Sequence, residues 1–181
     1  NRYITSLEPE IKKVIEDCLD KIHNQDTFDL IDDLAKPLPA IVIAKMMGLP
    51  DQDLDKFQAW SEDLLLGVGG IGTTKEDIKK SGDAYEALIK YFEKIILSRK
   101  DSPGDDFIGK LIQAEEEGDK LNIKEMYGTC LLLLIAGHET TTRLIGNGMF
   151  TFFKHPEQFD ELGKDYGLIP NAIEEMLRYE P

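Results

Sequence analysis

The segment Asn122–Pro156, NIKEMYGTCLLLLIAGHETTTRLIGNGMFTFFKHP, predicts one long α-helix and sets the fold class. Its start carries the N-x-x-E pattern of Asn122 and Glu125, in which each side chain bonds a free backbone N–H of the other residue. Pro156 marks the other end, because proline cannot continue a helix. About 32 residues at 1.5 Å per residue span roughly 48 Å, which is long for a small domain. We therefore expect a central helix that crosses a larger protein.

The middle of this helix, Ala136–Thr142 (AGHETTT), contains residues that helices disfavour. One glycine and three threonines cost about 2–3 kcal/mol relative to alanine. The Thr140 hydroxyl can bond the carbonyl of Ala136 and loosen the helix, and Gly137 lets a flat group approach closely. Glu139 beside Thr140 adds an acid to the alcohol, and such a pair can pass protons. The alternative is a helix that packs closely against a neighbour and turns its polar residues to water.

The rest of the chain also shows helical spacing of apolar residues, and no segment alternates as a strand would. A single partial domain over 1–181, mainly α, is predicted. Ser6 is a candidate N-cap for the first helix, and Thr74 begins the fourth. The expected helices cover Leu7–Ile22, Leu38–Met47, Asp53–Leu66, Thr74–Ile96, Phe107–Ala114, Pro156–Gly163 and Pro170–Tyr179. The buried stripe expected for the fourth helix consists of Ile78, Tyr85, Leu88, Ile89, Phe92, Ile95 and Ile96.

The composition argues against several classes of partner. The formal net charge of −14 disfavours nucleic acid and anionic membranes, which both attract clustered Lys and Arg. Cys18 and Cys130 lie on apolar faces and predict small buried side chains rather than a disulfide framework. The longest apolar run, Cys130–Ala136, is too short to span a bilayer. We expect a cytoplasmic protein that binds neither nucleic acid nor membrane.

Three further patterns are weaker. Gly67–Gly72 (GVGGIG) matches a dinucleotide fingerprint, but a predicted helix precedes it where that site needs a strand, so a flexible loop is expected. His138-Glu139 begins like a zinc-hydrolase motif, but Thr142 stands where the second histidine is required, so no metal site is predicted. Glu175 and Arg178 share a helix face as an i, i+3 pair, which alone indicates only an ion pair.

Taken together, these residues resemble the heme-thiolate monooxygenases, the cytochromes P-450, and specifically their soluble bacterial type. The family's central helix carries [AG]-G-x-[DE]-T-[TS], which Ala136, Gly137 and Glu139–Thr141 match in order. A later helix of the family carries E-x-x-R, which Glu175 and Arg178 match at a fitting distance. LAKPLPAIVIAKMMGLP, FQAWSEDLL and DDFIGKLIQAEEEGDKLN are also similar to segments of this family, so the resemblance covers essentially all 181 residues.

The resemblance implies a function and a cofactor. It implies that O2 is activated on heme to hydroxylate a small apolar substrate, with electrons from NAD(P)H through a ferredoxin- or flavodoxin-type donor. Glu139 and Thr140 would deliver protons. The resemblance also places Leu133, Ala136, Gly137, Thr140 and Thr141 at the cofactor and Leu132 and Ile135 in the substrate pocket. It makes Glu175 and Arg178 a buried pair near the proximal side of the heme, and Leu64–Thr74 the lid that admits substrate.

The chain also departs from the family pattern. The family's axial cysteine lies in a loop well downstream of E-x-x-R, and neither Cys18 nor Cys130 has that context. We therefore expect a central portion of the domain, without its N-terminal part and its heme-ligand region. The competing interpretation is a non-catalytic helical fragment, or a ligand- or partner-binding module unable to hold heme by thiolate. A metal-dependent hydrolase using His138 and Glu139 is a third class.

Overall fold

The computed structural model describes residues 5–67, 72–116 and 121–179, which form helices and turns without strands. The mainly-α prediction is therefore confirmed for these ranges. The helices are α2 Glu8–Ile22, α3 Pro37–Met46, α4 Leu54–Leu66, α5 Lys75–Ser98, α6 Phe107–Glu116, α7 Ile123–Lys154, α8 Pro156–Lys164 and α9 Ile169–Tyr179. Three short helical turns join them: η1 Ile31–Ala35, η2 Asp51–Asp53 and η3 Tyr166–Leu168. None of the helices in the described ranges is long and apolar enough to cross a membrane.

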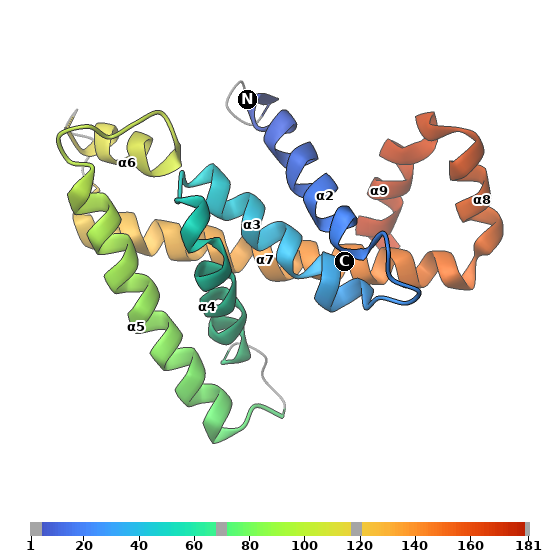
Figure 1. Cartoon of the computed structure of the whole chain (residues 1–181), viewed down its shortest axis with the longest axis horizontal. Coiled ribbons are helices and arrows are strands. Elements are labelled where there is room, and N and C mark those ends of the chain that lie inside the picture. The colour runs from blue at the N-terminus through green and yellow to red at the C-terminus, as the bar shows by residue number, and fades with distance from the viewer. Residues whose placement is uncertain (1–4, 68–71, 117–120, 180–181) are drawn as a thin grey trace.

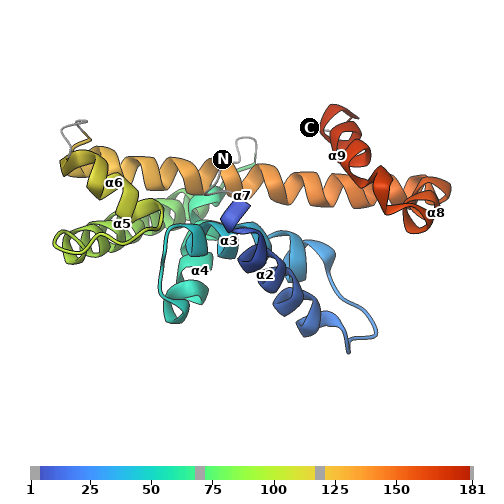
Figure 2. The ribbon, with the colours of Figure 1, turned by 90° about the horizontal axis from the view of Figure 1, so that it is seen from above.

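Helix α7 is the axis of the molecule. It has 32 residues and runs the length of the structure (Figure 1). Figure 2 shows α2, α3, α4 and α5 gathered on one side of it, while α8 and α9 turn back at its C-terminal end. One face of α7 therefore packs against the helices that precede it in the chain.

Local capping explains where the long helices begin. The Asn122 side chain accepts hydrogen bonds from the backbone N–H groups of Lys124 and Glu125 at 3.0 and 3.2 Å. The Glu125 carboxylate in turn accepts from the Asn122 N–H at 2.8 Å, so the predicted capping box of α7 is confirmed. Thr74 also caps α5 as predicted. The Ser6 prediction is wrong, because Leu7 occupies the N-cap position of α2, without a side-chain cap.

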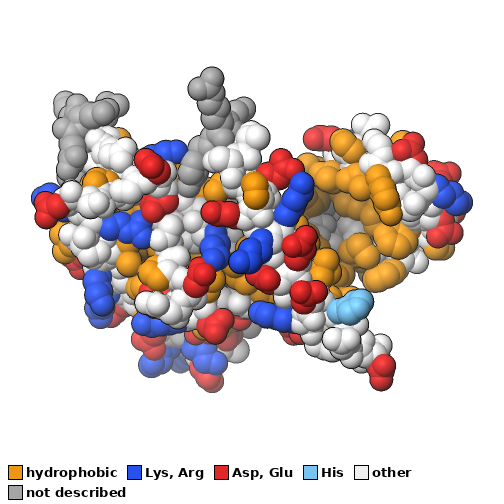
Figure 3. All heavy atoms as spheres, turned by 45° about the horizontal axis from the view of Figure 1, so that its top comes forward, with side chains coloured by type: hydrophobic (Ala, Val, Ile, Leu, Met, Phe, Trp, Pro, Cys, Tyr) orange, Lys and Arg blue, Asp and Glu red, His pale blue; other side chains and the backbone are white. Residues whose placement is uncertain are grey.

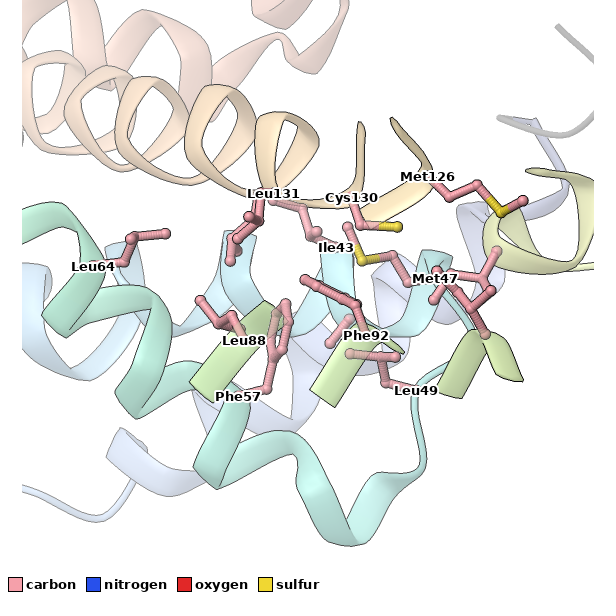
Figure 4. Packing of buried hydrophobic residues seen from close by; sticks show 14 of the residues in the cluster. Ile43, Met47, Leu49, Phe57, Leu64, Leu88, Phe92, Met126, Cys130 and Leu131 are labelled. Carbon is pink, nitrogen blue, oxygen red and sulfur yellow. The ribbon is translucent and has the colours of Figure 1, made fainter. Parts of the chain in front are cut away.

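The core lies where α3, α4 and α5 meet the first half of α7 (Figure 4). Phe57 of α4 and Phe92 of α5 meet edge to face, with ring centroids 6.2 Å apart. Cys130 of α7 is fully buried in this cluster, and Cys18 is buried on α2. Both cysteines are free, as predicted from their apolar settings.

Part of the stripe predicted for α5 is wrong. Ile78 and Tyr85 are 59% and 52% exposed, whereas Ala84 and Leu88 are buried, as are Phe92 and Ile96. Residues four apart are separated by about 400° of helix rotation, so the buried stripe shifts by about 40° at each step. Such a stripe arises when rows of side chains four apart pack into the grooves of a crossing helix. At the start of α5 the stripe has turned away from Ile78 and Tyr85.

A polar network fixes three chain segments together. Arg99, just after α5, donates one hydrogen bond to the Asp106 carboxylate at 2.8 Å and another to the carbonyl of Gly48. The same carboxylate accepts from the N–H of Gly109 at 2.9 Å and so starts α6, as expected for an aspartate before a helix. Gly48 has a φ of 71°, a left-handed conformation that glycine adopts without strain.

The glycine-rich segment follows a helix, since α4 ends at Leu66 and α5 starts at Lys75. Residues 68–71, the middle of the predicted lid Leu64–Thr74, lie outside the described ranges.

Candidate functional site

The central turn of α7 carries the Thr140 hydrogen bond that its sequence predicts, within a continuous α-helix. The Thr140 hydroxyl donates to the carbonyl of Ala136 at 2.6 Å, and the Thr142 hydroxyl donates to that of His138 at 2.9 Å. A hydroxyl that bonds the carbonyl four residues back competes with the helix ladder and tends to bend the helix. Two such bonds, from Thr140 and Thr142, lie in this one turn of α7.

One face of this turn is open. Leu132 is 67% exposed, and Ala136 and Thr140 follow on the same face at intervals of four residues. Thr141 is also exposed, about 100° further round the helix. The open face is thus narrow, with small side chains at its centre and a leucine at one end.

Other residues predicted for the site lie against the core. Leu133 and Ile135 are partly buried beside the core cluster. Gly137 faces α3, where an added Cβ would lie 2.9 Å from Cδ1 of Ile43. The glycine therefore has a packing role, the close approach of two helices, which was the alternative interpretation of this sequence.

Glu139 forms an ion pair on its own helix. The Nε of Arg143 donates to its Oε1 at 3.0 Å, and Nη2 contacts the same oxygen. Both residues line a pocket of about 580 Å³ between α7 and the ends of α4 and α5. The carboxylate thus has a route toward solvent on the flank of the open face, where Arg143 pairs with it.

His138 points away from the open face, into the protein, and also lines the pocket beside Glu139. It is 2% exposed, and its Nε2 lies 3.0 Å from the carbonyl of Lys36. Burial lowers the pKa of His138, because a charged ring loses hydration there. Among residues 5–67, 72–116 and 121–179, no three His, Cys, Asp or Glu side chains are grouped so as to hold a metal ion. The contact of His138 with Lys36, just before α3, was not predicted from the sequence, although the i, i+4 spacing of His138 and Thr142 was a signal for it.

Glu175 and Arg178 form the predicted pair on α9, with nitrogen–oxygen distances of 2.7 and 2.5 Å. The hydrogen bond from Arg178 lowers the pKa of Glu175. Among the described residues nothing covers the pair, since the Glu175 and Arg178 side chains are 59% and 69% exposed, and its burial near the heme stays a prediction. The pair forms from local helix geometry, whereas burial would require elements that pack over this face of α9.

A hollow lies beside that pair. A pocket of about 330 Å³ separates the end of α7 from α9, and Gly148, Met176 and Tyr179 line it. Figure 3 shows apolar side chains gathered around this hollow, over α8, α9 and the end of α7. Large apolar side chains exposed together around a hollow indicate a surface that another element covers.

A sequence model of the family "Cytochrome P450" matches residues 3–166. This chain belongs to the cytochrome P450 family. Cytochrome P450 107B1 from Saccharopolyspora erythraea is 37% identical over 179 residues, which are 99% of this chain and 42% of that protein. Erythromycin C-12 hydroxylase from the same organism is 37% identical over 180 residues, 99% of this chain and 45% of that protein.

Solved cytochrome P450 structures agree with this assignment. The ligand-free structure of cytochrome P450 TbtJ1 superposes with a TM-score of 0.89 at 38% identity, over 98% of this chain and 46% of that one. CYP109E1 from Bacillus megaterium in complex with corticosterone superposes with a TM-score of 0.88 at 36% identity, over 99% of this chain and 48% of that one. The chain therefore spans somewhat less than half the length of the relatives it matches.

The residues present fit one side of a cytochrome P450 heme. The open face of α7, with Ala136 at its centre and Leu132 at its end, is small and apolar enough for a flat ring. The cysteines do not fit the axial ligand of this family, a thiolate. Cys130 is fully buried in the core, and burial raises the pKa of its thiol to about 12; burial also raises the pKa of Cys18. The described residues thus offer a surface for one side of the cofactor but no axial ligand for its iron.

Proposed function

We propose that the full-length protein containing this chain is a heme-dependent monooxygenase that hydroxylates a small apolar organic substrate. The observation that supports this proposal most is the hydrogen bond from the Thr140 hydroxyl to the carbonyl of Ala136, on the open face of α7 and next to Glu139. In a cytochrome P450 chain this turn is the wall on which oxygen is activated. The alternative, a non-catalytic helical module, leaves the softened turn without a use.

The contact surface divides between cofactor and substrate. Ala136 and Thr140 would face the cofactor from the open face, with Leu133, Gly137 and Thr141 at its edges. Leu132 would contact the substrate, because its large side chain is 67% exposed on the open face, and Ile135 would line the pocket behind it. When bound, the heme supplies O2 binding and its reductive activation.

The chain's own task in this proposal is to handle protons. Because the Thr140 hydrogen is donated to Ala136, the lone pairs of Oγ1 face outward and accept a hydrogen bond from a proton donor held there. Glu139 takes up protons through the 580 Å³ pocket and passes them to that place. Arg143 holds the Glu139 carboxylate in place until that carboxylate moves out of the ion pair.

The family supports further parts of the proposal. Electrons would come from NAD(P)H through a ferredoxin- or flavodoxin-type donor, in the cytoplasm. An apolar substrate agrees with the solved relatives, since CYP109E1 was crystallised with corticosterone and with testosterone. Cytochrome P450BioI was crystallised with acyl carrier protein ligated to hexadec-9Z-enoic acid. We also propose that the longer protein covers the exposed pair of Glu175 and Arg178 and buries it near the heme.

Two experiments on the full-length protein test the proposal. A reduced, carbon monoxide-treated sample should show the strongly red-shifted Soret band of thiolate-bound heme. Thr140→Ala should consume oxygen but release more of it as peroxide and form less product. Thr129→Ala is the matched control, since its hydroxyl makes the same bond to the carbonyl of Glu125 at 2.8 Å, nearly three turns away. Unchanged coupling in Thr140→Ala would remove Thr140 from the proton path.

A further inference from the structure

We propose that His138 and Thr142 are positioning residues that fix the rotation of α7, and with it the direction in which Glu139 and Thr140 point. The inference rests on the proposed function, because it concerns the same turn. Both residues reach across to backbone carbonyls of the segment that joins η1 to α3. They lie one helical turn apart and enclose Glu139, Thr140 and Thr141 between them.

The hydrogen bond of Thr142 to Ala35 depends on a proline in α3. In an α-helix the carbonyl of Ala35 would accept from the N–H of residue 39, but Pro39 has no N–H. The Thr142 hydroxyl lies 3.0 Å from this carbonyl and donates to it. The same hydrogen is shared with the carbonyl of His138 on α7. Since a buried carbonyl without a donor is costly, the proline leaves this carbonyl for another donor, which the Thr142 hydroxyl of α7 supplies.

The contact of His138 is the second tie. Its partner, the Lys36 carbonyl, is an acceptor only, so Nε2 carries the hydrogen. Burial lowers the pKa of His138 and so favours the neutral ring, while the hydrogen bond to the Lys36 carbonyl and the charges of Glu62 and Glu139 oppose that shift and the charge of Lys36 adds to it. The neutral ring then leaves Nδ1 as a buried acceptor with no hydrogen-bond partner among the described residues. A buried acceptor without a partner lowers the stability of the fold. Its presence here indicates that the contact of Nε2 with the Lys36 carbonyl serves another purpose, which we take to be positioning.

Together the ties act on a soft turn. The hydroxyl bonds of Thr140 and Thr142 to their own helix weaken its ladder, so this turn could bend or roll. Successive residues differ by about 100° around a helix, so a small roll would swing Thr140 away from the open face. The contact of Gly137 with Ile43 of α3 holds the same side. His138 and Thr142 thus hold the back of the turn whose front carries the reacting groups.

These residues act through position and not through contact with substrate. His138 is 2% exposed and faces away from the open side of α7. Replacing Thr142 by valine keeps the shape and removes the hydroxyl, whereas serine keeps the hydroxyl. Thr129→Val removes the equivalent hydroxyl from the first half of α7, where it bonds Glu125 of the same helix.

The test compares these variants in the full-length holoenzyme, through the share of consumed oxygen released as peroxide. We expect Thr142→Val to raise that share by about 5-fold, the factor that one lost hydrogen bond typically produces in an equilibrium. Thr142→Ser and Thr129→Val should stay near the unmodified protein, and so should the KM for substrate in all three. His138→Gln, which keeps a donor toward Lys36, should uncouple less than His138→Leu.

A stability loss alone would not produce this pattern. In Pro39→Ala the carbonyl of Ala35 regains a helical donor, so adding Thr142→Val to it should restore thermal stability but not coupling. Hydrogen exchange at residues 139–144 should be faster in Thr142→Val than in Thr129→Val, with or without turnover. Normal coupling in Thr142→Val together with uncoupling in Thr140→Ala would overturn the positioning role and leave the proposed function intact. Normal coupling in both variants, or no monooxygenase activity at all, would overturn both.

Discussion

Replacing Gly48 by alanine should destabilise the fold far more than the same change elsewhere. Gly48 has a φ of 71°, a conformation that costs an alanine about 1–2 kcal/mol. An added Cβ would also lie 2.0 Å from Oδ2 of Asp106 and 2.8 Å from its Cβ. Rotation of the carboxylate cannot relieve a clash with the Cβ, so the whole Asp106 side chain must shift.

That shift would break the network around Asp106. It separates the carboxylate from Arg99, at 2.8 Å, and from the Gly109 N–H that starts α6, at 2.9 Å. Hydrogen bonds to charged groups contribute about 1.5–3 kcal/mol, and a helix cap about 1 kcal/mol. Since the two side chains of the ion pair are only partly exposed and some contacts will re-form, we expect a total loss of about 3–5 kcal/mol.

Urea denaturation provides the assay, with Gly82→Ala as the matched control. Gly82 lies inside α5 with no atom within 4 Å of an added Cβ, so its alanine variant should gain about 0.5–1 kcal/mol. In an Asp106→Ala background the penalty of Gly48→Ala should shrink to the backbone strain and the remaining contact with the Cβ of residue 106, because the network is already lost. Equal stability of the two glycine variants, or an unchanged penalty in that background, would refute the reasoning.

Three other predictions concern the core, the buried histidine and the exposed pair. Phe92→Ala should cost about 3–5 kcal/mol in urea denaturation because Phe92 is fully buried, whereas Ile78→Ala on the exposed side of α5 should stay within about 0.5 kcal/mol; similar losses would contradict the assigned packing. Because the folded-state pKa of His138 lies below its ordinary 6.5, the unfolded chain binds more protons, so stability should fall as pH drops below 6.5. This acid sensitivity should be smaller in His138→Gln, and an identical pH profile would argue against a neutral buried ring. Arg178→Ala should leave the stability of this chain nearly unchanged but abolish heme incorporation in the full-length protein; normal heme content would show the pair is dispensable there.

Features set by neighbouring residues could be predicted from the sequence. The capping box of Asn122 and Glu125, the helix start at Thr74 and the bond from Thr140 to Ala136 each involve residues within one turn of one another. Their geometry follows from the helix alone, whatever packs around it. The pair of Glu175 and Arg178 was predictable for the same reason.

Features that depend on other helices could not be predicted. Ile78 and Tyr85 fit the helical period of α5, but the crossing angle with neighbouring helices decides which side is buried. The burial of Glu175 and Arg178 depends on elements that no pattern within α9 specifies. The sequence predicts that Gly137 lets a flat group approach, whereas its role in packing against α3 follows only from the position of Ile43. The family resemblance gave roles to these residues, but not their contacts.

The ties of α7 to the carbonyls of Ala35 and Lys36 also bear on the order of folding. They join residues 107 and 102 positions apart, whereas the Ser81 hydroxyl bonds Leu64 across only 17 positions. Closing the longer loop costs about 1.5 kcal/mol more chain entropy. We therefore expect α4 and α5 to pair early in refolding and the Glu139–Thr140 turn to gain amide protection late. The helical framework would then form before the side chains of Glu139 and Thr140 reach their final orientation.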